Sequence, residues 1–204
     1  MSEQPLLFSE EEMRKPAGDD IWQALRQRAL TCTQCGLCHT RKQVVFGLGN
    51  IKRPDLCLIG EAPGTADDMA GKPFTGGAGS LLQKILGAMH IKMDDVYLAN
   101  LVNCKPPGSR KPTPEEVHAC SGWIVSQIRA IQPKIIVTLG LEAANFILDL
   151  EEENLTKIRG RWGDWQGIPV MPTFSLPHLV LNPIDKSKAW GDLQEVVKKL
   201  GRSL

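Results

Sequence analysis

The residues with the clearest chemical potential are cysteines, of which the chain has six. Cys32 and Cys35 form a C-x-x-C pair, and Cys38 extends this pair to C-x-x-C-x-x-C. Cys104 and Cys120 form a second, wider pair. The N-terminus shows no basic start followed by an apolar core, so we expect a cytoplasmic protein. In that reducing compartment, clustered thiols bind metals more often than they form disulfides.

The composition indicates one ordinary globular domain. The chain has 204 residues, of which 42% are hydrophobic and 23% charged, and its formal net charge is +1. No apolar run approaches the roughly 18–20 residues that span a bilayer, so we expect no membrane contact. The net charge gives no overall case for nucleic-acid binding. Basic clusters at 105–111 and 157–161 leave a local basic surface open, although such clusters are also common in solvated loops.

Short apolar runs alternate with helical patterns along most of the chain. Residues 1–18 are polar and predict a flexible tail, followed by a single domain over 19–204. Predicted strands cover 56–59, 96–101, 134–139 and 168–173, and predicted helices cover 19–30, 79–89, 114–131, 141–150 and 186–200. This alternation predicts an α/β fold with three layers, α/β/α, around a central four-stranded parallel sheet.

Ligands of parallel sheets bind at the carboxyl ends of the strands, which singles out four loops. They cover 60–78, 100–112, 140–142 and 174–184. The first contains G-E-A-P-G and G-K-P-F, whose glycines and prolines suit a tight backbone that approaches a ligand closely. The second begins at Asn100, directly at a strand end. A ligand site is therefore expected at this edge of the sheet.

The motifs, taken in order, resemble those of the family 4 uracil-DNA glycosylases, the iron-sulfur branch of their superfamily. The matching segments are G-E-A-P-G at 60–64, G-K-P-F-T-G at 71–76, V-Y-L-A-N at 96–100 and N-C-K-P-P at 103–107. Together with the cysteine spacing, the resemblance covers nearly the whole chain from 29 to 193. It implies the glycosylase fold and a DNA repair enzyme that flips uracil out of single- or double-stranded DNA and hydrolyses its bond to deoxyribose, leaving an abasic site. Other deaminated bases are left open as further substrates.

The resemblance also implies a 4Fe-4S cluster. Its ligands would be four thiolates, Cys32, Cys35, Cys104 and Cys120, and zinc on the same thiolates is the alternative. Cys38 would be a neighbour of the cluster or a spare ligand. Cys57, inside an apolar strand, is expected in the core. We expect the cluster to be structural and to hold a DNA-contacting loop that carries the basic residues Lys105, Arg110 and Lys111.

The resemblance implies how the base would be held. Phe74 would stack on the uracil ring, and the amide of Asn100 would pair with the polar edge of uracil. Cytosine presents the reverse donor and acceptor pattern, so an amide oriented by its surroundings would reject it. Gly60, Glu61 and Ala62 would contact the base through the backbone and position the attacking water, which makes Glu61 a predicted catalytic residue as well.

A departure from the family pattern concerns the fourth loop. Ser175 and Leu176 stand where the family has a His-Pro pair, whose histidine bonds uracil O2 and stabilises the departing anion. Either Ser175 supplies a weaker donor, or His178 reaches the site from a rearranged loop. Losing such a donor costs about 10²–10³ in rate, so reduced activity is expected, and the alternative is a DNA-binding member with weak or no activity. Asp67 would stabilise charge on the sugar or orient water, or simply start a helix.

Two further segments suggest contacts with macromolecules. Leu176, Leu179 and Val180 are predicted to form a wedge that fills the gap left by a flipped base, or else to pack on the domain. The peptide Q-P-L-L-F at 4–8 (Gln4 to Phe8) resembles the short motif by which bacterial repair proteins dock on the replication sliding clamp. We otherwise expect a monomer.

Overall fold

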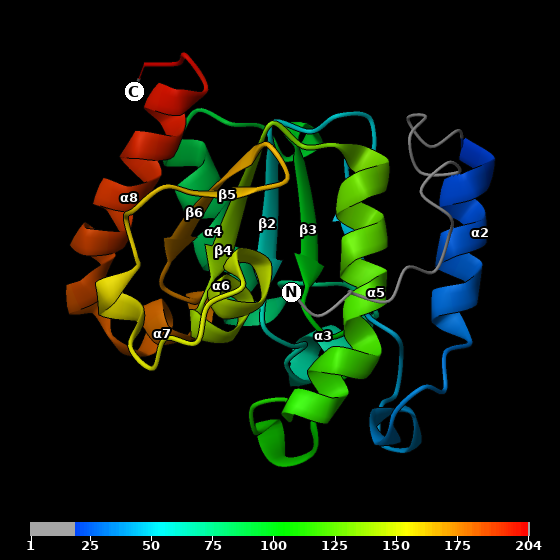
Figure 1. Cartoon of the computed structure of the whole chain (residues 1–204). Helices are drawn as coiled ribbons and strands as arrows, with labels where there is room; N and C mark the ends of the chain where they lie inside the picture. The colour runs from blue at the N-terminus through cyan, green and yellow to red at the C-terminus, as the bar shows by residue number, and fades with distance from the viewer. Residues whose placement is uncertain (1–18, 204) are drawn as a thin grey trace.

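The computed structural model describes residues 19–203. The predicted tail at 1–18 and the predicted clamp-binding peptide at 4–8 lie outside the described residues. Within the described part, the strands form one six-stranded sheet in the order β1-β3-β2-β4-β6-β5 (Figure 1). The strands are β1 (Leu48–Gly49), β2 (Leu56–Gly60), β3 (Val96–Asn100), β4 (Ile135–Leu139), β5 (Gly163–Trp165) and β6 (Ile168–Thr173).

The four central strands, β3, β2, β4 and β6, run parallel. They confirm the predicted four-stranded parallel sheet almost residue for residue. The edge strands β1 and β5 are antiparallel additions that the sequence analysis did not predict. Strands of two and three residues are too short to show an alternating pattern.

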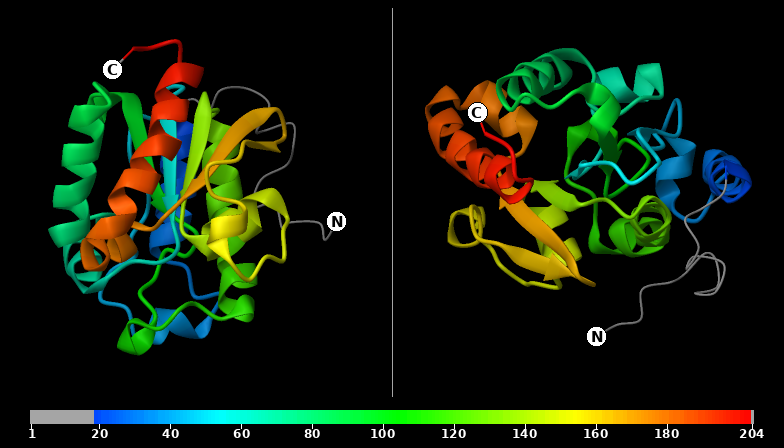
Figure 2. Two further views of the ribbon diagram at one scale, coloured as in Figure 1. Left: turned by 90° about the vertical axis from the view of Figure 1, so that its left-hand side faces the viewer. Right: turned by 90° about the horizontal axis from the view of Figure 1, so that it is seen from above.

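Helices cover both faces of the sheet, as the three-layer prediction required. Side chains alternate along each strand, so that Cys57 and Ile59 of β2 join the core on one face, whereas Leu56 and Leu58 join the core on the other. Figures 1 and 2 show the helices of the two outer layers on opposite sides of the strands. The first layer contains α2 (Asp19–Leu30), α5 (Pro114–Ile131) and α6 (Leu141–Leu148), and the second contains α4 (Gly76–Ala88) and α8 (Lys186–Lys199).

Short helical segments lie in the connections between these elements. The predicted loops 60–78 and 174–184 each contain a helix, α3 (Thr65–Ala70) and α7 (Leu176–Leu181). The Oγ atom of Ser175 caps α7 by accepting a hydrogen bond from the backbone N–H of His178, at 3.4 Å. The remaining turns are 3₁₀ helices: η1 (Gly36–His39), η2 (Met93–Asp95), η3 (Pro107–Ser109), η4 (Leu155–Lys157) and η5 (Pro183–Asp185).

The start of α5 fixes the basic loop that precedes it. Thr113 and Glu116 form a reciprocal capping box, in which each side chain accepts from the backbone N–H of the other. The Glu116 carboxylate also forms a bidentate ion pair with the Arg110 guanidinium, with N–O distances of 2.6 and 2.7 Å. The helix and the loop are therefore held together by one carboxylate.

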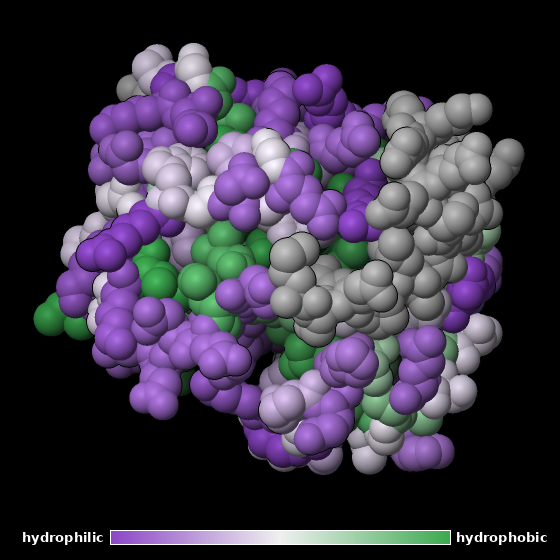
Figure 3. Space-filling view, viewed as in Figure 1, coloured by the Kyte–Doolittle hydropathy of each residue, from purple (hydrophilic) through white to green (hydrophobic). Residues whose placement is uncertain are grey.

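Hydrophilic residues dominate the face of the molecule seen in Figure 1, and apolar side chains show mainly in its hollowed centre (Figure 3). Among residues 19–203, no helix is both long enough and apolar enough to cross a membrane.

Candidate functional site

A cavity of about 420 Å³ opens at the carboxyl ends of the central strands. In Figure 1 the arrowheads of β2 and β3 point toward this end of the sheet, where α3 lies. Three of the four loops singled out by the sequence supply most of its lining, and the 140–142 turn lines a neighbouring pocket. The cavity brings together most predicted site residues: Gly60, Glu61, Ala62, Asp67, Phe74, Asn100, Arg110, Lys111, Ser175 and Leu176.

Gly60 leaves room for both Phe74 and Asn100 in the lining of this cavity. The parallel register places Gly60 beside Asn100. A Cβ atom on Gly60 would lie 2.5 Å from Oδ1 of Asn100 and 3.0 Å from ring atoms of Phe74. Phe74 itself has a φ of 53°, a left-handed conformation that is strained for a large side chain and is found at functional sites.

Asn100 carries a buried donor with no partner. The residue is 2% exposed, and its Nδ2 atom makes no hydrogen bond to any described residue. An unpaired buried amide costs about 1–3 kcal/mol, so such groups in native proteins call for an explanation. Because Asn100 lines the cavity, a ligand with a carbonyl oxygen would satisfy this donor.

Asp67 has both carboxylate oxygens engaged. Oδ2 accepts from the Gly64 N–H at 3.0 Å, and Oδ1 accepts from the Thr75 N–H and hydroxyl at 2.6 and 2.5 Å. The side chain therefore joins the G-E-A-P-G loop to the segment that carries Phe74. This arrangement matches the helix-start alternative, while the role of Asp67 in catalysis stays a prediction.

Glu61 faces the turn between β4 and α6. Its Oε1 atom accepts from the backbone N–H of Glu142 at 3.1 Å. Gly140, with a φ of 118°, makes room for this carboxylate, because a Cβ atom there would collide with Oε1 of Glu61. Burial raises the pKa of Glu61, and the backbone N–H of Glu142 and the charge of Lys111 oppose that rise. Glu61 thus joins two loops of the site.

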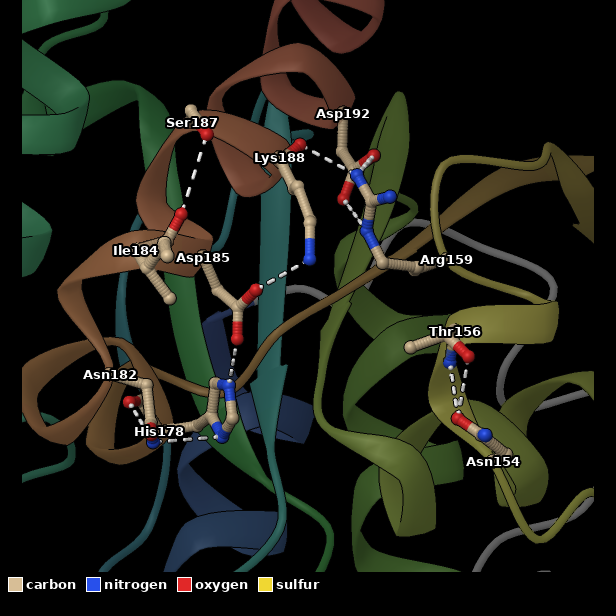
Figure 4. A network of polar contacts seen from close by, with 10 residues as sticks. All are labelled: Asn154, Thr156, Arg159, His178, Asn182, Ile184, Asp185, Ser187, Lys188 and Asp192. Atoms are coloured by element: carbon tan, nitrogen blue, oxygen red, sulfur yellow. Dashed lines mark hydrogen bonds and ion pairs between the residues drawn. The ribbon is translucent and has the colours of Figure 1, made fainter.

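The structure separates the two candidates for replacing the family histidine. Ser175 lines the cavity. His178 lines the neighbouring pocket, where its Nε2 atom lies 2.8 Å from Oδ2 of Asp185 (Figure 4). Its ring also stacks on Phe174, with centroids 4.9 Å apart. These contacts hold His178 in the neighbouring pocket, which Ser175 also lines, so of the two residues Ser175 alone lines the cavity at the carboxyl ends of the strands.

Of the three predicted DNA-contacting cations, two line the cavity and one lies beside it. Arg110 and Lys111 line it, whereas Lys105 is half-buried beside it and donates to the Pro106 carbonyl at 3.3 Å. Lys111 is paired with Glu142 at 3.0 Å, which links the basic loop to the turn that Glu61 contacts.

The burial of Leu176 and Leu179 argues against these two residues as parts of the predicted wedge and agrees with the alternative that they pack on the domain, whereas Val180, the third predicted member, is 44% exposed. The two leucines are 1% and 2% exposed and pack in the two cores beside α4 and α8. Leu176 and Leu179 are three residues apart and share one face of α7, so the helix turns both inward. The apolar side chains most exposed on this segment are Leu181 at 80% and Ile184 at 84%.

The cysteines of both sequence pairs line a second, enclosed cavity next to α5. Its lining contains the predicted ligands Cys32, Cys35, Cys104 and Cys120, together with Cys38 and Arg41. By contrast, Cys57 is fully buried in the core beneath α5, as predicted. Within residues 19–203, no three His, Cys, Asp or Glu side chains are arranged around a point that could hold a single metal ion.

Two of the thiols receive hydrogen bonds of the kind that support an iron-sulfur cluster. Arg41 Nη1 donates to Sγ of Cys104 at 3.2 Å, and the Asn103 N–H donates to Sγ of Cys120 at 3.3 Å. Burial raises the pKa of the Cys120 thiol to about 12 and also raises that of Cys104. Cluster binding would therefore displace protons from these sulfurs. The donor set of four thiols around one cavity fits the implied cluster.

Comparison with known proteins identifies the class first. The family model of the uracil DNA glycosylase superfamily matches residues 46–194, which include the lining of the cavity at the carboxyl edge and all four central strands. The similar proteins narrow the assignment. The type-4 uracil-DNA glycosylase of Thermotoga maritima is 38% identical over 84% of this chain and 95% of its own length. That of Archaeoglobus fulgidus is 41% identical over 66% of this chain and 71% of its own length. That of Saccharolobus solfataricus is 36% identical over 83% of this chain and 82% of its own length. The chain belongs to the type-4 uracil-DNA glycosylases.

Proposed function

We propose that this protein excises uracil from DNA by hydrolysing the bond between the base and deoxyribose, which leaves an abasic site. The observation that carries the proposal is the buried, unpartnered Nδ2 atom of Asn100 in a cavity at the carboxyl edge of the sheet. Uracil offers a carbonyl oxygen, O4, to that donor. The family assignment supports the same activity.

Three side chains would recognise and activate the base. Phe74 stacks on the ring, while Asn100 donates to O4 and accepts from N3–H, a pattern that cytosine cannot match. Ser175, at the cavity wall, donates to O2 and stabilises the anion that develops as uracil departs. A neutral hydroxyl does this less well than the family histidine, so we expect a slower enzyme. Backbone groups of Glu61 and Ala62 position the water.

The rim of the cavity would hold the DNA strand. Arg110 and Lys111 lie at the cavity and can neutralise phosphates at its mouth, with Lys105 beside them. Leu181 and Ile184 lie on the segment that follows Ser175 and are largely exposed. We assign the wedge that fills the gap in the base stack to these two residues.

A 4Fe-4S cluster held by Cys32, Cys35, Cys104 and Cys120 would complete the fold next to this rim. The cluster supplies structural cross-linking, because hydrolysis of a glycosidic bond needs no electron transfer. The cysteine cavity adjoins α5 and the segment from Asn103, which leads directly into the basic loop. Iron and acid-labile sulfide in the anaerobically purified protein support this assignment, and zinc in their place contradicts it.

Two expectations concern the cellular setting. We propose that the protein acts as a monomer in the cytoplasm and docks on the replication sliding clamp through residues 4–8. Pull-down by the clamp should retain the wild-type chain and lose the Leu7→Ala/Phe8→Ala variant. Equal retention of the two would contradict the docking proposal.

The glycosylase activity is tested with oligonucleotides that contain a single uracil. Single- and double-stranded forms are incubated with the anaerobically purified protein, and abasic sites are then cleaved with alkali. Product is expected from the wild type, and the Asn100→Ala variant should form it at least about 10²-fold more slowly. If enzyme in excess of substrate gives no product yet shifts the DNA in a gel, the protein is the alternative, a DNA-binding family member without catalysis.

A further inference from the structure

A fifth thiol lines the cysteine cavity beside the four ligands assigned to the cluster. Cys38 contributes to the same wall as Cys32, Cys35, Cys104 and Cys120. It lies outside the ligand set that the family resemblance implies. The inference below rests on the proposed cluster and concerns what this extra sulfur does.

Cys38 and Cys35 belong to the same tight turn. Cys35 precedes η1 as its N-terminal cap, and Cys38 is the third residue of that 3₁₀ helix. The Cys38 N–H donates to the Cys35 carbonyl at 3.2 Å, which closes the turn. Both residues also line the cysteine cavity, so this turn brings two thiols to one wall.

The two sides of the cavity differ in how firmly they hold their sulfurs. Cys104 and Cys120 are 6% and 7% exposed, and both sulfurs accept hydrogen bonds from Arg41 or the Asn103 backbone. Cys32, Cys35 and Cys38 are each half-buried and therefore more exposed than Cys104 and Cys120. Exposure favours oxidation or loss of a thiolate ligand, so a ligand is lost most readily on the side where the extra sulfur stands.

We propose that Cys38 is a reserve ligand that replaces Cys35 in holding the cluster. In the exchange, the Cys38 thiol gives its proton to solvent and its thiolate bonds the iron that Cys35 held. Cys35 leaves as a thiolate and takes up a proton, so one Fe–S bond forms and one breaks. No electron is transferred, and no further reactant is needed.

The test measures iron and acid-labile sulfide per chain, with visible absorbance, after anaerobic reconstitution of the full-length protein. The variants are Cys35→Ser, Cys38→Ser, the double variant Cys35→Ser/Cys38→Ser, and Cys104→Ser as a ligand with no neighbouring substitute. We expect Cys38→Ser to match the wild type. We expect Cys35→Ser to retain at least about fivefold more iron than the double variant, since one thiolate remains for the vacated position. The double variant and Cys104→Ser should lose the cluster.

Two results overturn the proposal. If Cys35→Ser, whether folded or not, retains less than about fivefold more iron per chain than the double variant, Cys38 does not replace Cys35 as a cluster ligand. If Cys38→Ser loses iron on its own, Cys38 is a primary ligand rather than a reserve. Both are distinct from failure of the cluster assignment itself, which would show as a wild-type protein without iron. Glycosylase activity enters none of these readouts.

Discussion

Gly60 and Asn100 face each other across β2 and β3 so closely that a Cβ atom on Gly60 would lie 2.5 Å from the Asn100 Oδ1 atom. The amide that we propose to read the base therefore occupies space that a side chain at position 60 would fill. The same position also borders the Phe74 ring. Substitution at Gly60 should therefore disturb stacking and base pairing together.

Gly60→Ala should lower uracil excision by about 10²-fold, because a displacement near 1 Å of positioning groups has an effect of that size. Its unfolding free energy should fall by about 1–3 kcal/mol, as expected for overpacking a buried site. Gly87→Ala is the matched control. It lies in α4 with no atom within 4 Å of the added methyl group, so it should keep full activity and gain about 0.5–1 kcal/mol. Equal kinetics for the two alanine variants would refute the close packing at Gly60.

Asn100→Ala should separate activity from stability. Its kcat/KM for uracil-containing DNA should fall by about 10²–10³, since the donor and acceptor that read the base are lost. Its unfolding free energy should stay level or rise, because the Nδ2 atom has no partner to lose in the free protein. Steady-state kinetics and denaturant unfolding measure the two quantities. A large loss of stability would mean that this amide has a structural partner.

Ser175→His should raise the rate of excision by about 10²-fold, the usual value of one anion-stabilising donor. Ser175→Ala is the converse test and should lower the rate. Alanine also removes the cap of α7, with an expected loss of about 1 kcal/mol, so thermal unfolding must be followed in parallel. An unchanged rate in Ser175→His would show that another group already supplies the contact to O2.

Leu181→Ala/Ile184→Ala should slow excision from double-stranded DNA and leave single-stranded DNA almost unaffected, because only a duplex has a base stack to fill. Both residues are exposed, so stability should change by less than about 0.5 kcal/mol. Met93→Ala is the control, because it removes another exposed apolar side chain, in η2 before β3 begins. It should leave the rate of excision from both DNA forms unchanged. Equal loss on both DNA forms would argue for a simple contact with the strand.

Glu61→Gln should change how stability depends on pH. Burial raises the pKa of Glu61, so the folded protein binds this proton more tightly than the unfolded chain does. Glu61 therefore contributes to the stability of the folded protein. This contribution is fully present below the ordinary pKa of glutamate, about 4.3, and is lost as pH rises through the raised pKa of Glu61 in the folded protein. The wild type should therefore lose stability relative to Glu61→Gln as pH increases to 8. Glu151→Gln, at an exposed position, controls for the loss of one charge. Parallel pH profiles for wild type and Glu61→Gln would contradict the burial effect.

The sequence predicted best where local signals were complete. The bounds of α5 agree with the prediction at both ends, because Pro114 marks its first turn and its apolar pattern runs unbroken to Ile131. Asn100 could be singled out because it ends a strand that leads to a parallel edge. The predicted residues of the G-E-A-P-G loop, with Phe74 and Asn100, do line one cavity. Their individual chemical roles remain predictions.

The fourth loop could not be predicted in the same way. Whether Ser175 or His178 faces the base depends on contacts with Phe174 and Asp185, and no local pattern encodes those contacts. The short helix α7 was also missed, because six residues after a serine and around a proline carry little periodic signal. Its presence explains why Leu176 turned out to be buried.

The two walls of the cysteine cavity are synthesised at different times. One wall comes from the segment after α2, whereas Cys104 and Cys120 follow only after β2, α4 and β3 have been made. A chain emerging from the ribosome therefore presents its first thiols long before the opposite wall exists. The cavity lining is complete only once the first half of α5 has been translated, yet before β4, β6 and α8 exist, so the cluster site can close before the sheet is finished.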